Sequence, residues 1–265
     1  MTQAITLPAS VTIVTLNCAA WLADTLDSVR DFAEVVILDS GSTDDTWAIA
    51  QRYPNVRIRH QDWLGFAGQK AMALSECSQP WVLNLDGDEV LSQDLCDEIA
   101  GVIVRDDVDG LVVPIRDAFL GELSHPLGYC HAKVRFFRRD KGRYAEGTDV
   151  HEGVLVDGRL RRASGNIEHY GETSVAVKLD KNNSYSTLKA GEKFRKGKHF
   201  STAKLVLVMP LAFIKSFVIR RDFLNGRRGF IGSMINAFYA FLKEAKLYEA
   251  EMRARAEQRA EQETR

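Results

Sequence analysis

An α/β fold, with a mostly parallel sheet flanked by helices, is the class that the sequence predicts. Short apolar runs alternate with segments of helical spacing in the N-terminal part of the chain, which is the pattern of parallel strands joined by helices. Polar residues directly follow several of these runs. With 265 residues, 45% of them hydrophobic, the chain can bury a full core, which excludes disorder of the whole chain.

The first predicted strand is the β-branched run 11–17, and a helix follows over 21–32, where Leu22, Leu26 and Val29 recur at helical spacing. Further strands are predicted at 35–38, 56–59 and 81–85, and further helices at 47–52, 67–76 and 93–104. Parallel sheets bind ligands at the carboxyl ends of their strands. The polar residues at those ends are therefore candidate binding residues.

The pattern changes beyond residue 110, where short strands at 111–115, 134–137 and 153–156 predict an antiparallel or mixed region. Later apolar segments, 205–214 and 230–242, are too short to span a bilayer. We predict a catalytic domain at 1–170, a basic amphipathic helical extension at 171–250 and a charged helical tail at 251–265.

The distribution of charge indicates the kinds of partner, and the cysteines and the N-terminal residues indicate the location. Residues 1–170 carry 16 Lys and Arg against 26 Asp and Glu, whereas residues 171–250 carry 15 against 6, so the two parts face different partners. The four scattered cysteines lack metal-like spacing, and the first ten residues lack the features of a secretory signal. Both observations favour a cytoplasmic location.

Asp86, Gly87 and Asp88 follow an apolar strand and form the most informative motif. Two carboxylates around a glycine can hold a divalent cation, Mg²⁺ or Mn²⁺, against a diphosphate. The cation would offset the charge that accumulates on a departing nucleotide diphosphate. An isolated motif of this kind is also compatible with a polar turn in which Asp86 caps a helix. The rest of the sequence must therefore distinguish a cation-binding motif from such a turn.

In context, these residues resemble the inverting family 2 glycosyltransferases of GT-A fold. The resemblance covers about residues 11–170 and depends on Thr15-Leu16-Asn17 after the first strand, Asp39-Ser40-Gly41-Ser42-Thr43-Asp44-Asp45-Thr46 after the second, and Asp86-Gly87-Asp88 after the fourth. It implies a GT-A fold and a UDP-sugar donor. The donor-binding residues that it implies are Thr15, Leu16, Asn17, Asp39, Ser42, Lys70 and Asp86. Alternatively, Asp39 and Ser42 act only as turn or cap residues.

The resemblance also implies metal ligands, which are Asp86 and Asp88. His169 is a candidate third ligand, because imidazole joins carboxylates around transition ions, although a structural role is the alternative.

An inverting transfer needs a base that deprotonates the acceptor hydroxyl. His151 and Glu152 resemble a subgroup of the family that includes bacterial lipopolysaccharide core glucosyltransferases, and Glu152 is the first candidate base, with Asp149 second. In the alternative interpretation Glu152 pairs with Arg143 and His151 is structural. The Gln-x-x-Arg-Trp motif of processive members is absent, which favours the addition of a single sugar, glucose by the same resemblance.

In the C-terminal extension, apolar segments lie beside basic residues, a composition that suits peripheral contact with an anionic membrane surface. The predicted location is the inner face of the cytoplasmic membrane. These basic residues are Lys198, Lys204, Lys215, Arg220, Arg221, Arg227 and Arg228. The acceptor would then be a lipid-linked glycan. The alternative is that ordinary amphipathic helices pack on the catalytic domain. A nucleic-acid partner is not predicted, because the basic segment interleaves with long aliphatic runs and contains no recognisable base-reading module.

Two other functions remain open from the sequence. One is a sugar nucleotidyltransferase, although no Gly-rich phosphate loop follows the first strand. The other is a nucleotide-binding module without activity that recruits partners to a membrane through its C-terminal helices.

Overall fold

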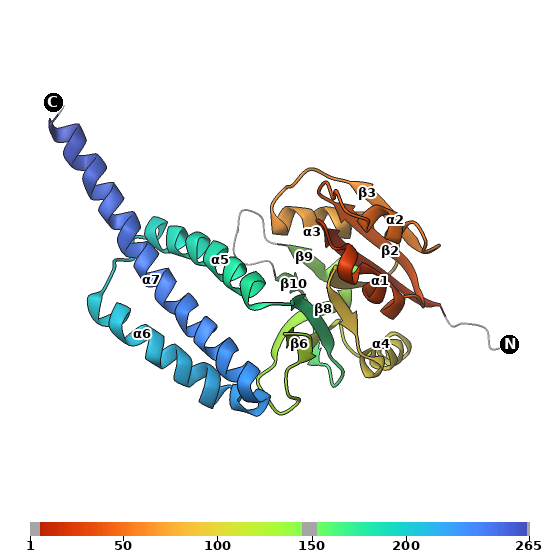
Figure 1. The fold of residues 1–265 in the computed structure, drawn as a ribbon. Helices are drawn as coiled ribbons and strands as arrows, with labels where there is room; N and C mark the ends of the chain where they lie inside the picture. The colour runs from red at the N-terminus through yellow and green to blue at the C-terminus, as the bar shows by residue number, and fades with distance from the viewer. Residues whose placement is uncertain (1–5, 145–152, 264–265) are drawn as a thin grey trace. The chain divides into compact units, whose positions relative to one another are not determined.

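The structure is a computed structural model that describes residues 6–144 and 153–263. The chain divides into two compact units, shown in Figure 1. Unit 1 comprises Met1–Asp117 and Cys130–Gly171, and unit 2 comprises Ala118–Tyr129 and Glu172–Arg265.

Unit 1 is an α/β unit whose elements follow the predicted alternation. In chain order they are β1 (Leu7–Thr15), α1 (Ala19–Ser28), β2 (Phe32–Asp39), α2 (Thr46–Ala50), β3 (Val56–His60), α3 (Phe66–Ser75), β4 (Trp81–Asp86), β5 (Glu89–Leu91), α4 (Gln93–Arg105), β6 (Gly110–Phe119), β8 (His131–Arg138), the 3-10 helix η1 (Arg139–Lys141), β9 (Gly142–Tyr144), β10 (Val154–Val156), β11 (Leu160–Arg162) and β12 (Ile167–Glu172). The last residues of β6 and β12 belong to unit 2.

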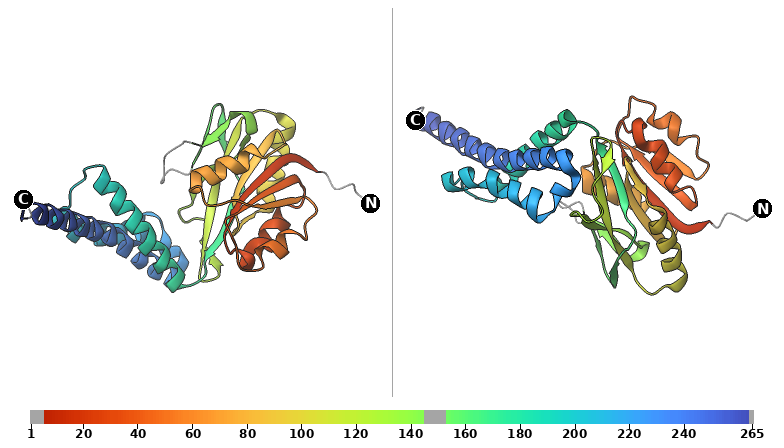
Figure 2. Two further views of the ribbon diagram at one scale, coloured as in Figure 1. Left: turned by 90° about the horizontal axis from the view of Figure 1, so that it is seen from above. Right: turned by 60° about the horizontal axis from the view of Figure 1, so that its bottom comes forward.

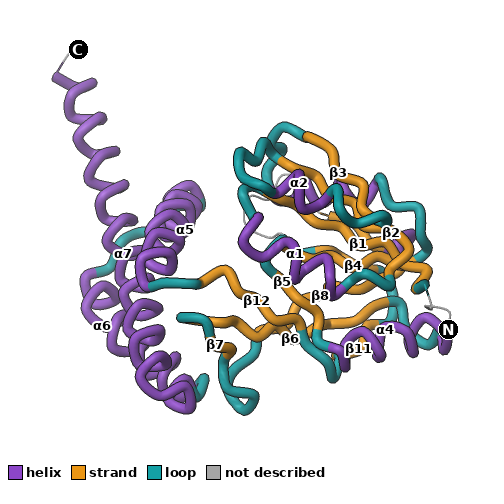
Figure 3. Tube along the Cα trace, turned by 45° about the vertical axis from the view of Figure 1, so that its right-hand side comes forward, coloured by secondary structure: helices purple, strands orange, loops and turns teal. Residues whose placement is uncertain are grey.

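The main sheet joins a parallel part to an antiparallel part. Its strand order is β3-β2-β1-β4-β8-β6-β12-β5, and β11 also pairs with β6 (Figure 3). The pairs among β3, β2, β1 and β4 are parallel, whereas β8 pairs antiparallel with both β4 and β6. The predicted change from a parallel sheet to a mixed region is therefore confirmed.

Helices cover both faces of this sheet (Figure 2). Ile37 of β2 is buried in one cluster with Leu22 of α1 and Leu95 of α4, whereas its neighbour Val36 packs in a second cluster with Leu74 of α3. Successive strand residues point to opposite faces, so these clusters lie on the two sides of the sheet. Each fully buried Leu or Ile side chain contributes about 1.5–3 kcal/mol to the free energy of folding, relative to an exposed one.

Unit 2 is mainly helical. Its elements are the short strand β7 (Glu122–Leu123), α5 (Val175–Arg195), α6 (Thr202–Ile214), the π-helix η2 (Lys215–Ile219), the 3-10 helix η3 (Asp222–Asn225) and α7 (Gly226–Glu263). Ser174 and Ser201 cap α5 and α6, because each hydroxyl accepts a hydrogen bond from a backbone N–H of the first turn. The helix α7 packs against both α5 and α6 (Figure 1).

The prediction that the apolar segments of unit 2 are too short for a membrane span is wrong for α6. The π-helix η2 continues α6 directly, so the run Thr202–Ile219 has 18 helical residues with mean hydropathy 1.8. By length and composition alone it could cross a membrane. The predicted tail at 251–265 is helical as far as Glu263, as the end of α7.

Candidate active site

The carboxyl ends of β1, β2 and β4 lie side by side in unit 1. The parallel register pairs Thr15 with Asp39 and Val14 with Asp86. The side chains that follow these three strands therefore share one edge of the sheet, as the sequence predicted.

Asp39 is fully buried at this edge and is held by several donors. Its carboxylate accepts hydrogen bonds from the hydroxyl of Thr15 at 2.9 Å, the backbone N–H of Gly41 at 3.0 Å and that of Ser42 at 2.8 Å. The Ser42 hydroxyl and the Trp47 indole donate to it as well. Burial would raise the pKa of Asp39, but these bonds outweigh it and lower the pKa. In this structure Asp39 organises the loop, and its contact with a nucleoside stays a prediction.

The loops after β1 and β2 are joined by hydrogen bonds. Asn17 adopts a left-handed conformation (φ 53°), which Asn tolerates better than most residues. Its backbone N–H donates to the Ser42 hydroxyl at 2.8 Å, and its side-chain oxygen accepts from the N–H of Thr43 at 2.8 Å. Asp44 accepts from the N–H of Ala19 at 3.0 Å. The second loop thus satisfies donors at the start of α1.

A pocket of about 400 Å³ opens beside these loops. Its lining is Val14, Thr15, Leu16, Ser40, Trp63 and Phe66. Trp63 and Phe66 pack edge to face at 4.7 Å, and both remain exposed, so an aromatic surface is available for a planar ring. Neither residue of this pair was predicted from the sequence as a site residue. The available signal was two aromatic residues close together in the chain, the first of them three residues after β3 ends.

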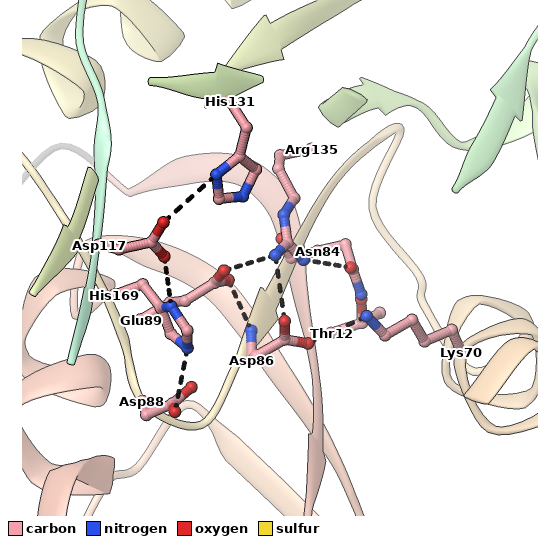
Figure 4. Close-up of polar contacts among 10 residues, drawn as sticks. All are labelled: Thr12, Lys70, Asn84, Asp86, Asp88, Glu89, Asp117, His131, Arg135 and His169. Carbon is pink, nitrogen blue, oxygen red and sulfur yellow. Dashed lines mark hydrogen bonds and ion pairs between the residues drawn. The ribbon is translucent and has the colours of Figure 1, made fainter. Parts of the chain in front are cut away.

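Asp86 at the end of β4 lies between two positively charged side chains (Figure 4). Lys70 of α3 donates to one carboxylate oxygen at 3.0 Å, and Arg135 of β8 donates to the other at 3.1 Å. Packing around the carboxylate would raise the pKa of Asp86, but these two charges outweigh it and hold the pKa well below its usual range. Lys70 is buried, so it is a charge fixed at the site rather than a solvated one.

Arg135 is a site residue that sequence reasoning missed. Its guanidinium donates to the Glu89 carboxylate at 2.5 Å and to the side-chain oxygen of Asn84 at 2.8 Å. The side chains of Arg135 and Glu89 are both buried. Burial raises the pKa of Glu89, and the charge of Arg135 offsets only part of that rise. The available signal was an arginine inside an otherwise apolar strand segment.

Asp88 faces His169 of β12 across the turn that follows β4 (Figure 4). The imidazole Nε2 lies 3.3 Å from the Asp88 carboxylate, and Nδ1 lies 2.8 Å from the carboxylate of Asp117. Asp117 also pairs with His131 at 3.4 Å. Burial would raise the pKa of Asp117, but the hydrogen bonds and charges of the two histidines lower it.

Gly171 provides the space that Asp88 occupies. A Cβ added at Gly171 would lie 2.2 Å from an oxygen of Asp88 and 3.1 Å from Nε2 of His169. Any other residue at this position would push the carboxylate or the imidazole aside. The chain thus leaves room for this pair, which is an observation that fits a ligand site.

The predicted trio of metal ligands is only partly assembled. Among the described residues no group of three His, Cys, Asp or Glu side chains could hold a metal ion. The reason is that Asp86 is turned to Lys70 and Arg135, whereas Asp88 and His169 meet. A carboxylate suits Mg²⁺ or Mn²⁺ when substrate phosphates and water complete the shell, and an added imidazole favours a transition ion such as Mn²⁺. Asp88 and His169 therefore fit such a cation in the presence of a diphosphate.

The two candidate bases, Glu152 and Asp149, lie outside the described residues, and so does His151. The alternative ion pair between Glu152 and Arg143 is likewise outside them.

Known proteins resemble this chain over most of its length. The family model described as glycosyl transferase family 2 matches residues 10–201. The lipopolysaccharide core biosynthesis glycosyltransferase LpsC of Rhizobium meliloti (strain 1021) is 36% identical over 250 residues, which cover 92% of this chain and 93% of LpsC. An uncharacterized glycosyltransferase of Rickettsia typhi is 34% identical over 262 residues, with 93% and 88% covered.

Solved structures of TarS from S. aureus also match. The match to TarS 1–349 covers 94% of this chain and 91% of the TarS chain, at 15% identity and a TM-score of 0.48. The match to the complex of TarS 1–349 with UDP-GlcNAc covers 86% of this chain and 79% of the TarS chain, at 17% identity and a TM-score of 0.48. The chain spans 45% of the longer TarS structure.

The family match covers the strand ends and both motifs around Asp39 and Asp86, and LpsC matches through unit 2 as well. The predicted α/β fold of GT-A type is confirmed. The chain belongs to glycosyl transferase family 2 and is a glycosyltransferase.

Proposed function

We propose that the chain transfers a single sugar with inversion from a UDP-sugar to a lipid-linked glycan, in a reaction that depends on Mg²⁺ or Mn²⁺. The observation that carries this proposal is the shared sheet edge. Thr15 and Asp39 pair in register there, next to the strand that leads to Asp86 and Asp88. A nucleoside and its diphosphate can therefore be held by adjacent strand ends.

The donor would occupy the pocket of about 400 Å³ and the groups beside it. The exposed Trp63 and Phe66 provide an apolar surface for the uracil ring, and Thr15, Leu16, Asn17 and Ser42 lie in the loops around it. Lys70 would supply positive charge to the diphosphate, and Asp86 would accept from the ribose hydroxyls. The cation on Asp88 and His169 would offset the charge of the departing UDP.

For the acceptor we propose a lipopolysaccharide core-like glycolipid and for the sugar glucose. The support is the relative LpsC, whose name places it in lipopolysaccharide core biosynthesis. Glu152 is the proposed base, with Asp149 second. The addition of one sugar is proposed because the sequence lacks the Gln-x-x-Arg-Trp motif of processive family members.

The test is release of UDP from a panel of UDP-sugars with a membrane extract as acceptor, with Mg²⁺ or Mn²⁺ and with EDTA. We expect release from one donor, which stops when EDTA removes the cation. Release that persists in EDTA would overturn the metal dependence. Release of pyrophosphate from a nucleoside triphosphate and a sugar phosphate would instead indicate a nucleotidyltransferase.

Unit 2 supports peripheral contact with an anionic membrane. The outward face of α6 and η2 is apolar and exposed, and we define it by Val206, Leu207, Leu211, Ile214, Val218 and Ile219. The inward residues, such as Val208 and Phe213, are only half-buried, so only 6% of the Thr202–Ile219 segment is buried. Lys215 is exposed next to Ile214 of this face, which suits anionic headgroups, whereas Lys204 pairs with Glu244 of α7 and the Arg220 guanidinium packs over Tyr129.

The double change Leu211→Glu and Ile214→Glu is expected to abolish flotation of the full chain with phosphatidylglycerol vesicles. Carboxylates would desolvate in the headgroup region and repel its charge. Val104→Glu is the matched control, because Val104 is 84% exposed on α4 of unit 1. Equal flotation of both variants would overturn this face as the contact. Extraction at high pH then separates a peripheral helix, which is released, from a spanning one.

A further inference from the structure

His169 lies between two carboxylates that come from different parts of unit 1 (Figure 4). Its Nε2 faces Asp88 at 3.3 Å, and its Nδ1 faces Asp117 at 2.8 Å. The proposed function uses only the first of these carboxylates. Asp117 therefore has no role yet, although it makes the shorter contact.

The tautomer of the imidazole depends on what Nδ1 meets. An imidazole can offer an Nε2 lone pair to a cation only when its single proton is on Nδ1. A carboxylate at Nδ1 favours that tautomer and fixes the plane of the ring, and partners of this kind are common behind metal-bound histidines. Asp117 has the position and the charge for this role.

Asp117 is itself fixed by neighbouring strands. It belongs to β6, and its other oxygen lies 3.4 Å from Nδ1 of His131 on β8, the strand that pairs with β6. On the far side of the imidazole, Gly171 leaves the space that Asp88 fills. The positions of all these groups are thus set by strands or by the turn after β4, rather than by long loops.

We propose that Asp117 is a positioning residue of the cation site. It accepts the Nδ1 proton of His169, so that Nε2 is directed at the site beside Asp88, and His131 steadies Asp117 from its other side. This inference rests on the proposed metal-dependent function, in which Asp88 and His169 hold the cation.

The first experiment measures Mn²⁺ binding to the full chain in saturating UDP, by the electron paramagnetic resonance signal of free Mn²⁺. Asp117→Ala is expected to weaken Mn²⁺ binding about 10- to 100-fold. Asp117→Asn keeps an acceptor oxygen for Nδ1–H and is expected to lose less. Asp109→Asn is the matched control, because Asp109 precedes β6 and pairs with Lys141 at 2.7 Å, among residues that take no part in this site.

A second readout follows the imidazole itself. Long-range ¹H–¹⁵N spectra of the metal-free chain are expected to show a proton on Nδ1 of His169 in the wild type and in Asp109→Asn, and its loss in Asp117→Ala, in which the Asp88 carboxylate at Nε2 is the remaining acceptor. A change that only loosened the fold would not select one tautomer.

The outcomes separate the two proposals. Absence of Mn²⁺ binding by the wild type would overturn the metal-dependent function and this inference with it. If the wild type binds Mn²⁺, and Asp117→Ala binds it equally well with an unchanged tautomer, the role of Asp117 is overturned while the proposed function stands.

Discussion

Replacing Asp88 with Ala is expected to lower kcat/KM for sugar transfer about 10³-fold, a loss of about 4 kcal/mol of transition-state stabilisation. The reason is that Asp88 is the carboxylate that meets His169, whereas Asp86 already pairs with Lys70 and Arg135. Steady-state release of UDP at saturating Mn²⁺ measures the loss. The thermal unfolding midpoint should stay near that of the wild type, because the Asp88 side chain is 29% exposed.

Asp94→Ala is the control for this result. Asp94 is an exposed carboxylate in the first turn of α4, so its removal costs only a few tenths of a kcal/mol of helix stability and no activity. If Asp88→Ala retained the activity of this control, Asp88 would have no role in holding a cation.

Replacing Arg135 with Met is expected to destabilise the chain by about 3–5 kcal/mol. Arg135 is 3% exposed and pairs with Glu89, which is 2% exposed, so the substitution leaves an uncompensated carboxylate in the interior. The same substitution removes one of the two positively charged partners of Asp86 and leaves only Lys70. Equilibrium unfolding in urea, followed by circular dichroism, measures the difference.

Arg138→Met provides the matched comparison on the same strand. Arg138 pairs with Asp106, which is largely exposed, and its guanidinium packs over Trp81. Its loss is expected to cost about 1 kcal/mol or less. Equal destabilisation by the two substitutions would show that the buried charges around Arg135 are not what stabilises this region.

The parallel half of the fold was predictable because three of its four strands, β1, β2 and β4, are short apolar runs, and segments with apolar residues at helical spacing lie between the strands. Strand β12 was missed for a physical reason: residues 167–172 are mostly polar, and only Ile167 is fully buried. Its place in the sheet depends on pairing with β5. In that pairing Ile167 lies opposite Leu91, which is 76 residues away along the chain, so the contact adds no local pattern. The length of α6 was missed because Pro210 and Lys215 interrupt the apolar run without ending the helix.

The site was predictable where motifs are contiguous and not where distant strands supply single residues. Asp39 and Asp86 end strands, and Asp88 follows in the turn after β4, so their convergence follows from the parallel order. Arg135 and Asp117 come from the antiparallel part, and no spacing in the sequence relates them to Asp86 or His169. Asp86 is turned away from Asp88 because its carboxylate pairs with Lys70 and Arg135, which lie 16 and 49 residues away along the chain.

The hydrogen bonds that join the loops after β1 and β2 bear on how fast a donor can bind. Asn17, Ser42, Thr43 and Asp44 connect the two loops through hydrogen bonds within the chain itself. A binding surface that is ordered in advance loses little conformational entropy when its ligand arrives. Nucleotide association on this side should therefore proceed as a simple bimolecular encounter, with an observed rate that rises linearly with nucleotide concentration and does not level off at a loop-closing step.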